Sequence, residues 1–259
     1  MATKKETTNF DDFDPERYMK DYYDDASWLY MEGEDLPFAF NELHRAFSSF
    51  QLKGNRLLDI GTGPSIHSII SASSHVDEIY LSDYSPKNRK YLQKWKEGDI
   101  NFNEGMIKYL LRLEGSKTTA ADRQKQMRIK VKDIFHIDIK TEQPLGSNNI
   151  EKFDIITSSY CLEAVTHSLN EFHACIHNIA SLLKINGHII VAGELEASRY
   201  VVGDYKFKCV AVSQSDVYNS FEQAGFRIES FREMSAPNPG KDLLSDFKGA
   251  YVMVAKKVR

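Results

Sequence analysis

The sequence predicts an α/β fold in which helices cover both faces of a mostly parallel sheet. The first observation is an apolar run from Leu57 that meets the turn Gly61-Thr62-Gly63 and then a helix pattern. The second is Asp83, which ends the next strand pattern 22 positions after Gly61. The third is the alternation of strand and helix patterns, which favours parallel strands joined by right-handed crossovers. A glycine turn at a helix start exposes backbone N–H groups, and an acid at this spacing suits ribose hydroxyls. The observations therefore indicate a nucleotide-like cofactor.

The expected elements follow this alternation along the chain. The last two strands lack a helix of clear period between them, so we expect an antiparallel closure at one edge of the sheet. A β-hairpin is expected near 201–212. Seven strands are predicted over 56–60, 78–82, 134–139, 153–158, 188–192, 226–231 and 250–255. Helices are predicted over 36–50, 65–73, 85–95, 168–184 and 214–224.

Length and composition fit one domain with additions. A chain of 259 residues, 42% of them hydrophobic, can build a single large domain over 13–259. Residues 1–12 are polar and have little to bury, so we expect a flexible N-terminus. Residues 13–50 are expected to form an N-terminal helical cap, whose tyrosines either pack as a surface helix or close as a lid over a ligand. The charged stretch 96–130 is expected to form a helical insertion.

Charge and composition exclude several classes of protein. A net charge of −4 and a pI near 6.1 leave no electrostatic footprint for nucleic acid. No apolar run reaches the roughly 18 residues of a membrane span, and the polar N-terminus is not a secretory signal. Cys161, Cys175 and Cys209 are widely spaced, as expected for reduced thiols in the cytoplasm. His173 and His177 are four residues apart without an evident third ligand, so no metal site is expected.

The turn itself narrows the choice of cofactor. A dinucleotide-binding turn requires a third glycine, and that position is Ile66. A phosphate-binding P-loop requires a lysine that this turn lacks. The remaining pattern, Asp59-x-Gly61-x-Gly63 with an acid at the end of the second strand, resembles that of S-adenosylmethionine-dependent methyltransferases. This ligand has no pyrophosphate, so an acidic residue beside the glycines is tolerable.

Further motifs, in fixed order, make the resemblance more specific. They are Phe13-Asp14-Pro15-Glu16-Arg17-Tyr18, Tyr22-Tyr23, Asp59-Ile60-Gly61-Thr62-Gly63-Pro64, Ser82-Asp83-Tyr84 with Asn88, Ile137-Asp138-Ile139 with Gln143-Pro144-Leu145-Gly146, Cys161-Leu162-Glu163-Ala164, and Leu182-Leu183-Lys184. With these motifs the chain resembles the family of nicotinamide, phenylethanolamine and indolethylamine N-methyltransferases. The resemblance implies a Rossmann-like fold with a seven-stranded, mostly parallel sheet, an antiparallel last strand and an N-terminal helical lid. It also implies a monomer that uses S-adenosylmethionine.

The resemblance implies the cofactor contacts position by position. His67 stands where the family usually has tyrosine. Asp133 is an alternative acidic match for the adenine contact, but only Asp138 keeps the family's distance to the turn Gln143-Pro144-Leu145-Gly146. The implied contacts are Tyr18, Tyr23, Gly61, Thr62, Gly63 and His67 for the amino-acid end, Asp83 and Asn88 for the ribose, Tyr84, Asp138 and Ile139 for the adenine, and Ser159 near the sulfonium.

The acceptor side must satisfy the chemistry of an amine. A cationic amine has to lose a proton before its lone pair can attack, and the protein otherwise positions the two reactants. Glu163, just after the fourth strand pattern, is the main catalytic candidate to bind the amine and help accept that proton. The motif around it resembles the phenylethanolamine branch, which uses this glutamate to hold the amine. From spacing alone, Glu163 also fits an acid in the first turn of a helix.

The stretch 193–200 supplies further candidates but matches neither branch in full. The phenylethanolamine branch has two consecutive glutamates, of which Glu196 is kept as a second catalytic candidate and the other aligns with Ala197. The nicotinamide branch has an aspartate that aligns with Gly193. The substrate-binding candidates are Tyr22, Tyr160, Glu163, Glu194, Tyr200 and Asp246, with the tyrosines as an aromatic enclosure.

These observations favour one function over two others. The favoured function is an S-adenosylmethionine-dependent N-methyltransferase that acts in line on a small-molecule amine or pyridine, nicotinamide- or arylalkylamine-like. The alternative is a non-catalytic S-adenosylmethionine-binding protein of the same fold, motivated by Gly193 and Ala197 at the substituted acceptor positions. A nucleic-acid or protein methyltransferase conflicts with the acidic pI and with a closed aromatic lid.

Overall fold

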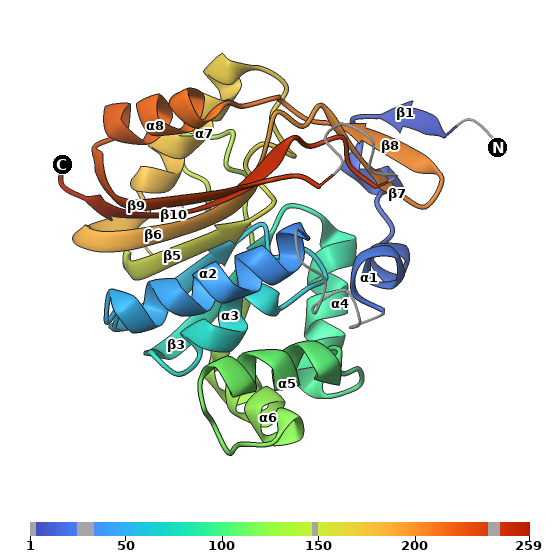
Figure 1. Ribbon diagram of the computed structural model, residues 1–259, viewed down its shortest axis with the longest axis vertical. Coiled ribbons are helices and arrows are strands. Elements are labelled where there is room, and N and C mark those ends of the chain that lie inside the picture. The colour runs from blue at the N-terminus through green and yellow to red at the C-terminus, as the bar shows by residue number, and fades with distance from the viewer. Residues whose placement is uncertain (1–3, 25–33, 147–149, 238–243) are drawn as a thin grey trace.

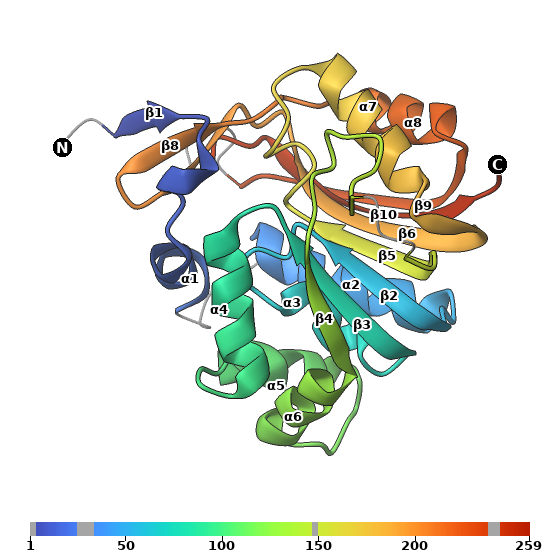
Figure 2. The same ribbon diagram turned by 180° about the vertical axis from the view of Figure 1, so that it is seen from behind.

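The protein, described by a computed structural model over residues 4–24, 34–146, 150–237 and 244–259, is built on a central sheet. Within these residues the sheet has seven strands in the order β4-β3-β2-β5-β6-β10-β9 (Figures 1 and 2). Those from β4 to β6 pair in parallel, and β10 pairs antiparallel with both β6 and β9. The expected α/β fold with an antiparallel last strand is confirmed. The strands are β2 (Gly54–Ile60), β3 (Val76–Asp83), β4 (Val131–His136), β5 (Phe153–Ser159), β6 (Leu183–Leu195), β9 (Phe226–Ser235) and β10 (Gly249–Lys257).

Alternation along the strands divides the core into two layers. Leu57 and Leu58 are neighbours in β2, yet they join opposite clusters because successive residues of a strand face opposite sides. The helices are α2 (Asp35–Ser49), α3 (His67–Ala72), α4 (Pro86–Glu97), α5 (Glu104–Leu113), α6 (Ala120–Lys130), α7 (Leu169–Ala180) and α8 (Gln214–Gln223). The cluster of Leu57 includes side chains of α2 to α6, and that of Leu58 includes side chains of α7 and α8 (Figure 1).

The first helix, α1 (Pro15–Tyr23), begins where the sequence signals it. Asp14 caps it, because its carboxylate accepts the backbone N–H of Glu16 at 3.0 Å. The Tyr22 hydroxyl donates to the carbonyl oxygen of Val201 at 2.9 Å, which holds the helix against the second half of the chain. This contact places the tyrosines of α1 beside the carboxyl ends of the parallel strands.

The N-terminal residues differ from the flexible segment expected over 1–12. The elements here are β1 (Lys5–Thr7), the 3-10 helix η1 (Phe10–Asp12), β7 (Arg199–Val202) and β8 (Tyr205–Lys208). Residues 1–3 lie outside the described part of the chain, but β1 pairs in parallel with β8, and the Phe10 ring stacks 6.0 Å from that of Phe207. The expectation of flexibility is therefore wrong for residues 5–12. The edge of the β7–β8 hairpin offers backbone partners, and an aromatic contact adds to them.

Several boundaries differ from the sequence-based prediction. β4 ends before the predicted 134–139 segment does, so Asp138 lies in the loop beyond the strand. β6 begins at Leu183 rather than at 188, because the chain continues through Asn186 in a left-handed conformation (φ 67°) and the register with β5 shifts. The expected antiparallel closure at one edge is confirmed, since β10 and β9 form it and β9 is the outermost strand.

The helices α5 and α6 fall within the stretch expected to form a helical insertion, 96–130. Arg123 of α6 is buried and donates to Glu114 at 2.9 Å and to the carbonyl oxygen of Ile70 at 3.0 Å, which ties this pair of helices to α3. The expected cap over 13–50 comprises α1 and α2, and its residues 25–33 lie outside the described part. Among the described residues no helix has both the length and the apolar composition needed to cross a membrane.

Candidate cofactor and acceptor site

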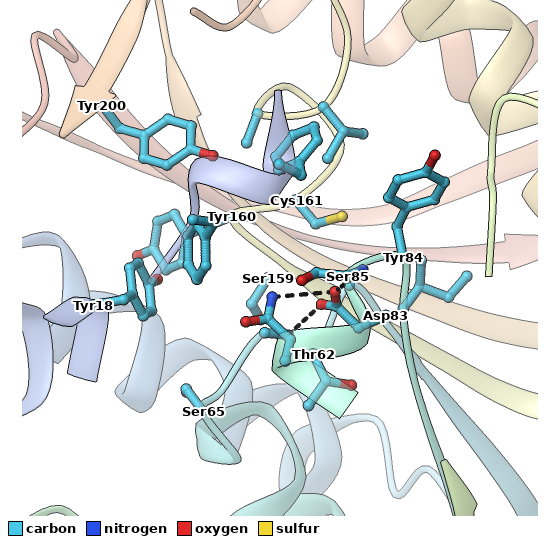
Figure 3. A pocket seen from close by; sticks show the side chains of 18 of the residues that line it. Tyr18, Thr62, Ser65, Asp83, Tyr84, Ser85, Ser159, Tyr160, Cys161 and Tyr200 are labelled. Carbon is cyan, nitrogen blue, oxygen red and sulfur yellow. Dashed lines mark hydrogen bonds between the residues drawn. The ribbon is translucent and has the colours of Figure 1, made fainter. Parts of the chain in front are cut away.

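A cavity of about 370 Å³ lies at the carboxyl ends of β2, β3 and β5, beneath the tyrosines of α1. Ligands of open α/β sheets bind at this edge, and the volume falls in the range of small-molecule sites. In Figure 3 Tyr18, Tyr160 and Tyr200 gather on one side of the cavity, and Asp83 and Tyr84 lie on the other. We divide the cavity into a donor half, around the glycine turn and Asp83, and an acceptor half that includes Glu163, Glu194, Tyr22, Tyr160 and Tyr200.

The two glycines of the turn have different structural roles. Gly61 and Gly63 both have left-handed backbones, with φ of 65° and 63°. A Cβ atom at Gly61 would lie 2.1 Å from the Sγ atom of Cys161, so this glycine allows close packing of the turn against the chain after β5. A Cβ atom at Gly63 would meet nothing within 4 Å, so this side of the turn is open space. Thr62, between them, also lines the cavity.

The carboxylate of Asp83 is buried and held in one orientation. Its Oδ2 atom accepts the N–H of Gly63 at 2.8 Å, and its Oδ1 atom accepts from the Ser85 N–H at 2.8 Å and from the Asn88 amide at 3.1 Å. Burial raises the pKa of Asp83, and these hydrogen bonds oppose the shift. One lone pair of Oδ2 stays open, and the Oδ1 atom of Asn88 is buried without a partner among the described residues.

The residues expected near the adenine line the outer part of the donor half. Asp138 and Ile139 lie in the loop after β4, where the Asp138 N–H donates to the carbonyl oxygen of Pro144 at 2.9 Å. Tyr84 lines the cavity and is 53% exposed, so its ring forms an outer wall. Asp133, the alternative acid, is exposed and is not among the described residues that line the cavity. The geometry therefore agrees with Asp138 rather than Asp133.

His67 and the lid tyrosines form a connected group. The rings of Tyr18 and Tyr22 stack at 4.6 Å, and the Tyr23 hydroxyl lies 3.1 Å from the Nδ1 atom of His67, which also lies 2.6 Å from the Ser65 hydroxyl. Burial lowers the pKa of His67 to about 4, so the ring is neutral at pH 7. The Nε2 atom of His67 is buried without a partner among the described residues.

Glu163 is a buried carboxylate with one unsatisfied oxygen. It is 3% exposed and lines the cavity from the turn after β5. Its Oε1 atom accepts the N–H of Glu194 at 2.8 Å, and its Oε2 atom has no partner among the described residues. Burial raises the pKa of Glu163 to about 7, against the opposing effect of that hydrogen bond. The group can therefore exchange a proton near neutral pH.

The other acceptor candidates that line the cavity come from β6, the hairpin and the lid. The Oε2 atom of Glu194 accepts the Ser245 hydroxyl at 2.6 Å, and burial raises the pKa of Glu194 well above its ordinary value. Tyr200 stacks on Phe207 at 5.1 Å, and Tyr160 has a left-handed backbone with φ of 53°. The remaining expected contacts, Tyr22 and Ser159, also line the cavity, and the Ser159 hydroxyl has no partner among the described residues.

Two expected site residues do not reach the cavity. Glu196 is 51% exposed at its side chain and pairs with Lys248 at 2.6 Å. It follows the last residue of β6 in a left-handed conformation (φ 54°), which breaks the strand alternation that would have kept it on the face of Glu194. Asp246 instead accepts the backbone N–H groups of Ser198 and Arg199, at 2.8 and 3.0 Å, and so stabilises a turn. We correct both expectations accordingly.

Sequence reasoning also missed residues that the fold brings in. Asp35 lines the cavity from the first turn of α2, and burial raises its pKa to about 6. Ser65 lines it beside His67. The only local signal for Asp35 is that of an acid at a helix start, which is common for aspartates with a purely structural role. No group of three or more His, Cys, Asp or Glu side chains in the described chain is arranged to hold a metal ion.

Comparison with known proteins assigns the family. Residues 2–258 match the model of the NNMT/PNMT/TEMT family. The chain belongs to this family. It is 30% identical to human nicotinamide N-methyltransferase over 95% of this chain and 93% of that protein. It is 32% identical to indolethylamine N-methyltransferase of Oryctolagus cuniculus (88% and 90%) and 30% identical to phenylethanolamine N-methyltransferase of Macaca mulatta (95% and 89%).

Solved structures agree with the fold of this NNMT/PNMT/TEMT family member. The N-methyltransferase NodS from Bradyrhizobium japonicum WM9, in complex with S-adenosyl-L-homocysteine, superposes with a TM-score of 0.52 at 12% identity and covers 91% of this chain and 94% of its own. Magnesium protoporphyrin IX methyltransferase from Synechocystis PCC 6803 with bound S-adenosyl-L-homocysteine gives 0.55 at 13% identity, with 93% of each chain covered. At these identities the likeness shows the fold.

Family membership confirms the expectation of an S-adenosylmethionine-dependent N-methyltransferase. The geometry of the donor half is compatible with that cofactor. Gly63 leaves open space beside the turn, and Asp83 keeps a free lone pair for a hydroxyl donor. Asn88 and Ser159, each with a polar atom that has no partner among the described residues, also line the cavity. The residues present therefore fit a ligand with a ribose, an adenine and an amino-acid end.

Proposed function

We propose that this enzyme methylates the nitrogen of a small-molecule amine that is cationic in water. One observation carries the proposal: Glu163 is buried in the cavity wall with its Oε2 atom unpartnered among the described residues. An unpaired buried acceptor costs free energy, and an ammonium donor in the cavity would offset that cost. The relatives that act on arylalkylamines, by their names, add support for an amine.

In this proposal the donor half holds the cofactor. S-adenosylmethionine, when bound, supplies an electrophilic methyl group on a sulfonium sulfur. Asp83 and Asn88 bind the ribose hydroxyls, and the open side of Gly63 receives the amino-acid end. Further proposed contacts at the amino-acid end are Tyr18, Tyr23, Gly61, Thr62 and His67. Ser159 is proposed to lie near the sulfur, and Tyr84, Asp138 and Ile139 are proposed to contact the adenine.

Glu163 is proposed to accept the proton that the amine must lose. Its pKa is raised to about 7. At neutral pH a substantial fraction of Glu163 is therefore ionised and able to accept a proton, and its basicity is high enough to hold that proton. The amine nitrogen gives its proton to Glu163 and forms the new N–C bond, while the sulfur keeps the electron pair of the bond that breaks. Tyr22, Tyr160 and Tyr200 exclude water and position the amine.

A pyridine is the alternative acceptor within the same reaction class, as the name of nicotinamide N-methyltransferase indicates for that relative. A neutral ring nitrogen has its lone pair free and needs no base. The variant Glu163→Gln would therefore slow an amine and spare a pyridine. The Oε2 atom of Glu163, unpartnered among the described residues, favours the amine, since a pyridine nitrogen has no proton to give it.

A methylation screen tests the proposed function. The enzyme is supplied with S-adenosylmethionine labelled in the methyl group and with panels of amines, pyridines and thioethers, and products are detected by mass. We expect methylated amines. Cofactor binding without any methylated product would instead favour the non-catalytic alternative, which Gly193 and Ala197 at the substituted acceptor positions motivate.

The remaining parts of the proposal concern the domain, the oligomeric state, the cellular location and the class of substrate. We propose that residues 13–259 act as one methyltransferase domain, that the enzyme is a cytoplasmic monomer, and that it does not act on nucleic acid. The free thiols of Cys161, Cys175 and Cys209 support a reducing compartment. The net charge of −4 argues against a nucleic-acid substrate.

A further inference from the structure

Three acidic side chains from three separate elements line the acceptor half. Asp35 comes from the first turn of α2, Glu163 from the turn after β5 and Glu194 from the end of β6. Among the described residues that line the whole cavity, Lys140 is the only lysine or arginine, and it belongs to the donor half, two positions after Asp138. Among the described residues, the acceptor half therefore has acidic side chains and no lysine or arginine, so it suits a cationic ligand.

Within the described residues, no lysine or arginine is paired with these three acids. Glu163 and Glu194 receive only neutral donors, a backbone N–H at 2.8 Å and the Ser245 hydroxyl at 2.6 Å. The Oε2 atom of Glu163, in a side chain only 3% exposed, receives no hydrogen bond from any described residue. This orphaned oxygen indicates that a ligand group completes the site.

Two tyrosine rings connect Asp35 with Glu194. The Tyr160 hydroxyl donates to the carbonyl oxygen of Asp35 at 3.2 Å, and Tyr22 is fixed by its bond to the hairpin. Tyr22, Tyr160, Asp35 and Glu194 all line the cavity. Burial raises the pKa of Tyr22 and of Tyr160, and the charges of Asp35 and Glu194 raise it further. The charge of Asp35 also raises the pKa of Glu194. Aromatic rings and carboxylates that line one cavity form a favourable environment for an organic cation.

One ammonium ion beside Glu163 would leave the pair Asp35 and Glu194 uncompensated. Two carboxylates that repel each other across a partly desolvated space are stabilised most by a cation held between them. We propose that the acceptor is a diamine, with one nitrogen methylated beside Glu163 and a second ammonium held by Asp35 and Glu194 against Tyr22 and Tyr160. This inference rests on the proposed function, because it specifies the amine of that same reaction.

Equilibrium binding tests the second charge without requiring turnover. The probes are 1,4-diaminobutane and 1,5-diaminopentane, each compared with butylamine or pentylamine of the same chain length. Binding to the protein saturated with S-adenosylhomocysteine is measured by calorimetry. We expect each diamine to bind about 10- to 100-fold more tightly than its matched monoamine, as for a charge-assisted contact that is largely desolvated. Equal affinities of the two members of each pair would overturn the inference.

Matched variants separate the two proposed acids from general charge effects. Asp35→Asn and Glu194→Gln should each reduce the ratio of diamine to monoamine affinity toward one. Glu34→Gln removes a neighbouring negative charge at the same helix start, and Glu196→Gln removes the exposed acid two positions from Glu194. Both controls should preserve the ratio. A thermal melt of each variant with S-adenosylhomocysteine verifies that it is folded, and an equal loss of the ratio in variant and control would contradict the assignment.

Methylation assays distinguish this inference from the proposed function. Turnover of diamines with a higher kcat/KM than monoamines supports both. Methylation of monoamines without any preference for a second charge leaves the proposed function standing and overturns the diamine. Tight diamine binding without methylation of any amine keeps the dication site and overturns the proposed function. Tighter binding of Mg²⁺ or Ca²⁺ than of every diamine would replace the organic dication with a metal ion and so overturn the inference.

Discussion

The donor and acceptor halves of the cavity differ in how many hydrogen bonds their buried carboxylates accept. In the donor half, Asp83 accepts hydrogen bonds from Gly63, Ser85 and Asn88, which offset the loss of water around its charge. In the acceptor half, Glu163 accepts a single hydrogen bond and keeps an oxygen without a partner among the described residues. The donor acid is held in place by the fold, whereas the acceptor acid is left for a ligand to satisfy.

This difference relates the two halves to what each has to bind. A cofactor of fixed structure is matched by a rigid turn whose hydrogen bonds are already made. A reacting amine needs a group whose protonation state can change, and a fully hydrogen-bonded carboxylate with a low pKa would hold the amine as an unreactive ammonium. The unsatisfied state of Glu163 therefore has a chemical use, and it should lower the stability of the free protein.

The largest expected effect lies in the donor half. Asp83→Ala removes a carboxylate that orients Gly63, Ser85 and Asn88, and it also removes the proposed ribose contact. We expect the affinity for S-adenosylmethionine to fall by about 100-fold or more, as for the loss of a charged hydrogen-bonding group with several partners. Calorimetry measures the affinity.

The matched control for this prediction is an aspartate in the neighbouring strand β4, outside the cavity wall. Asp133→Asn changes an exposed aspartate near the proposed adenine contact, and it should leave the cofactor affinity unchanged. A thermal melt shows whether Asp83→Ala still folds. If a folded Asp83→Ala variant bound the cofactor normally, the assignment of the donor half would fail.

The next prediction tests the role of Glu163 in the acceptor half. Glu163→Gln keeps an oxygen to accept the Glu194 N–H but removes the proposed base, so we expect kcat/KM for an amine to fall by about 100-fold, with little change in cofactor affinity. In the wild type kcat/KM should rise with pH through about 7, in addition to the inflection of the amine itself, because only ionised Glu163 accepts a proton. The pH profile measures this, and an inflection near 7 that survives in the variant would contradict the role.

The two halves also differ in how far the sequence predicts them. Gly61, Gly63 and Asp83 are placed by local rules, since a strand end, a tight turn and a helix start fix their positions together. Asp35 reaches the acceptor half from a cap helix more than 120 positions before Glu163, and no local spacing encodes that contact. Long-range packing decides such contacts, and a single sequence carries little trace of it.

The errors at Glu196 and Asp246 have the same origin. Both lie next to residues that do reach the cavity region, and their type suits an acceptor site. The left-handed backbone of Glu196 turns its side chain toward Lys248, and the N–H groups of Ser198 and Arg199 capture Asp246. Such conformations in a loop depend on several distant contacts at once, whereas the alternating strands and helices that define the sheet depend on hydrophobic periodicity.

A third prediction compares the two glycines of the donor turn. Alanine at either Gly61 or Gly63 meets the cost of a left-handed backbone, about 1 kcal/mol. At Gly61 the added methyl group would also lie 2.1 Å from Cys161 Sγ, so we expect a total loss of about 3 kcal/mol in the free energy of unfolding. At Gly63 the space is open, so the loss should stay near 1 kcal/mol. Denaturant titrations measure both, and equal losses would show that packing against Cys161 is unimportant.

The last prediction concerns how the stability of the free protein depends on pH. The pKa of Glu163 is about 7 in the folded protein and roughly 4.3 in an unfolded chain. Between these values the folded state binds more protons than the unfolded state. The contribution of Glu163 to the free energy of unfolding therefore falls as pH rises through this window, and the penalty is complete above about pH 7. Glu163→Gln removes the penalty, which is of order 3 kcal/mol before relaxation of the site.

We therefore expect the free Glu163→Gln variant to melt several degrees above the wild type at pH 8 and close to it at pH 5. Asp246→Asn is the matched contrast, because hydrogen bonds from the Ser198 side chain and backbone hold the pKa of Asp246 below its ordinary value, so its contribution is present at high pH and is lost as pH falls. That variant should lower the melting temperature at pH 8. Comparing each variant with the wild type at the same pH cancels the other titrating groups. A Glu163→Gln variant less stable than the wild type at pH 8 would mean that the unpartnered oxygen is satisfied in the free enzyme, and the contrast between the two halves would then disappear.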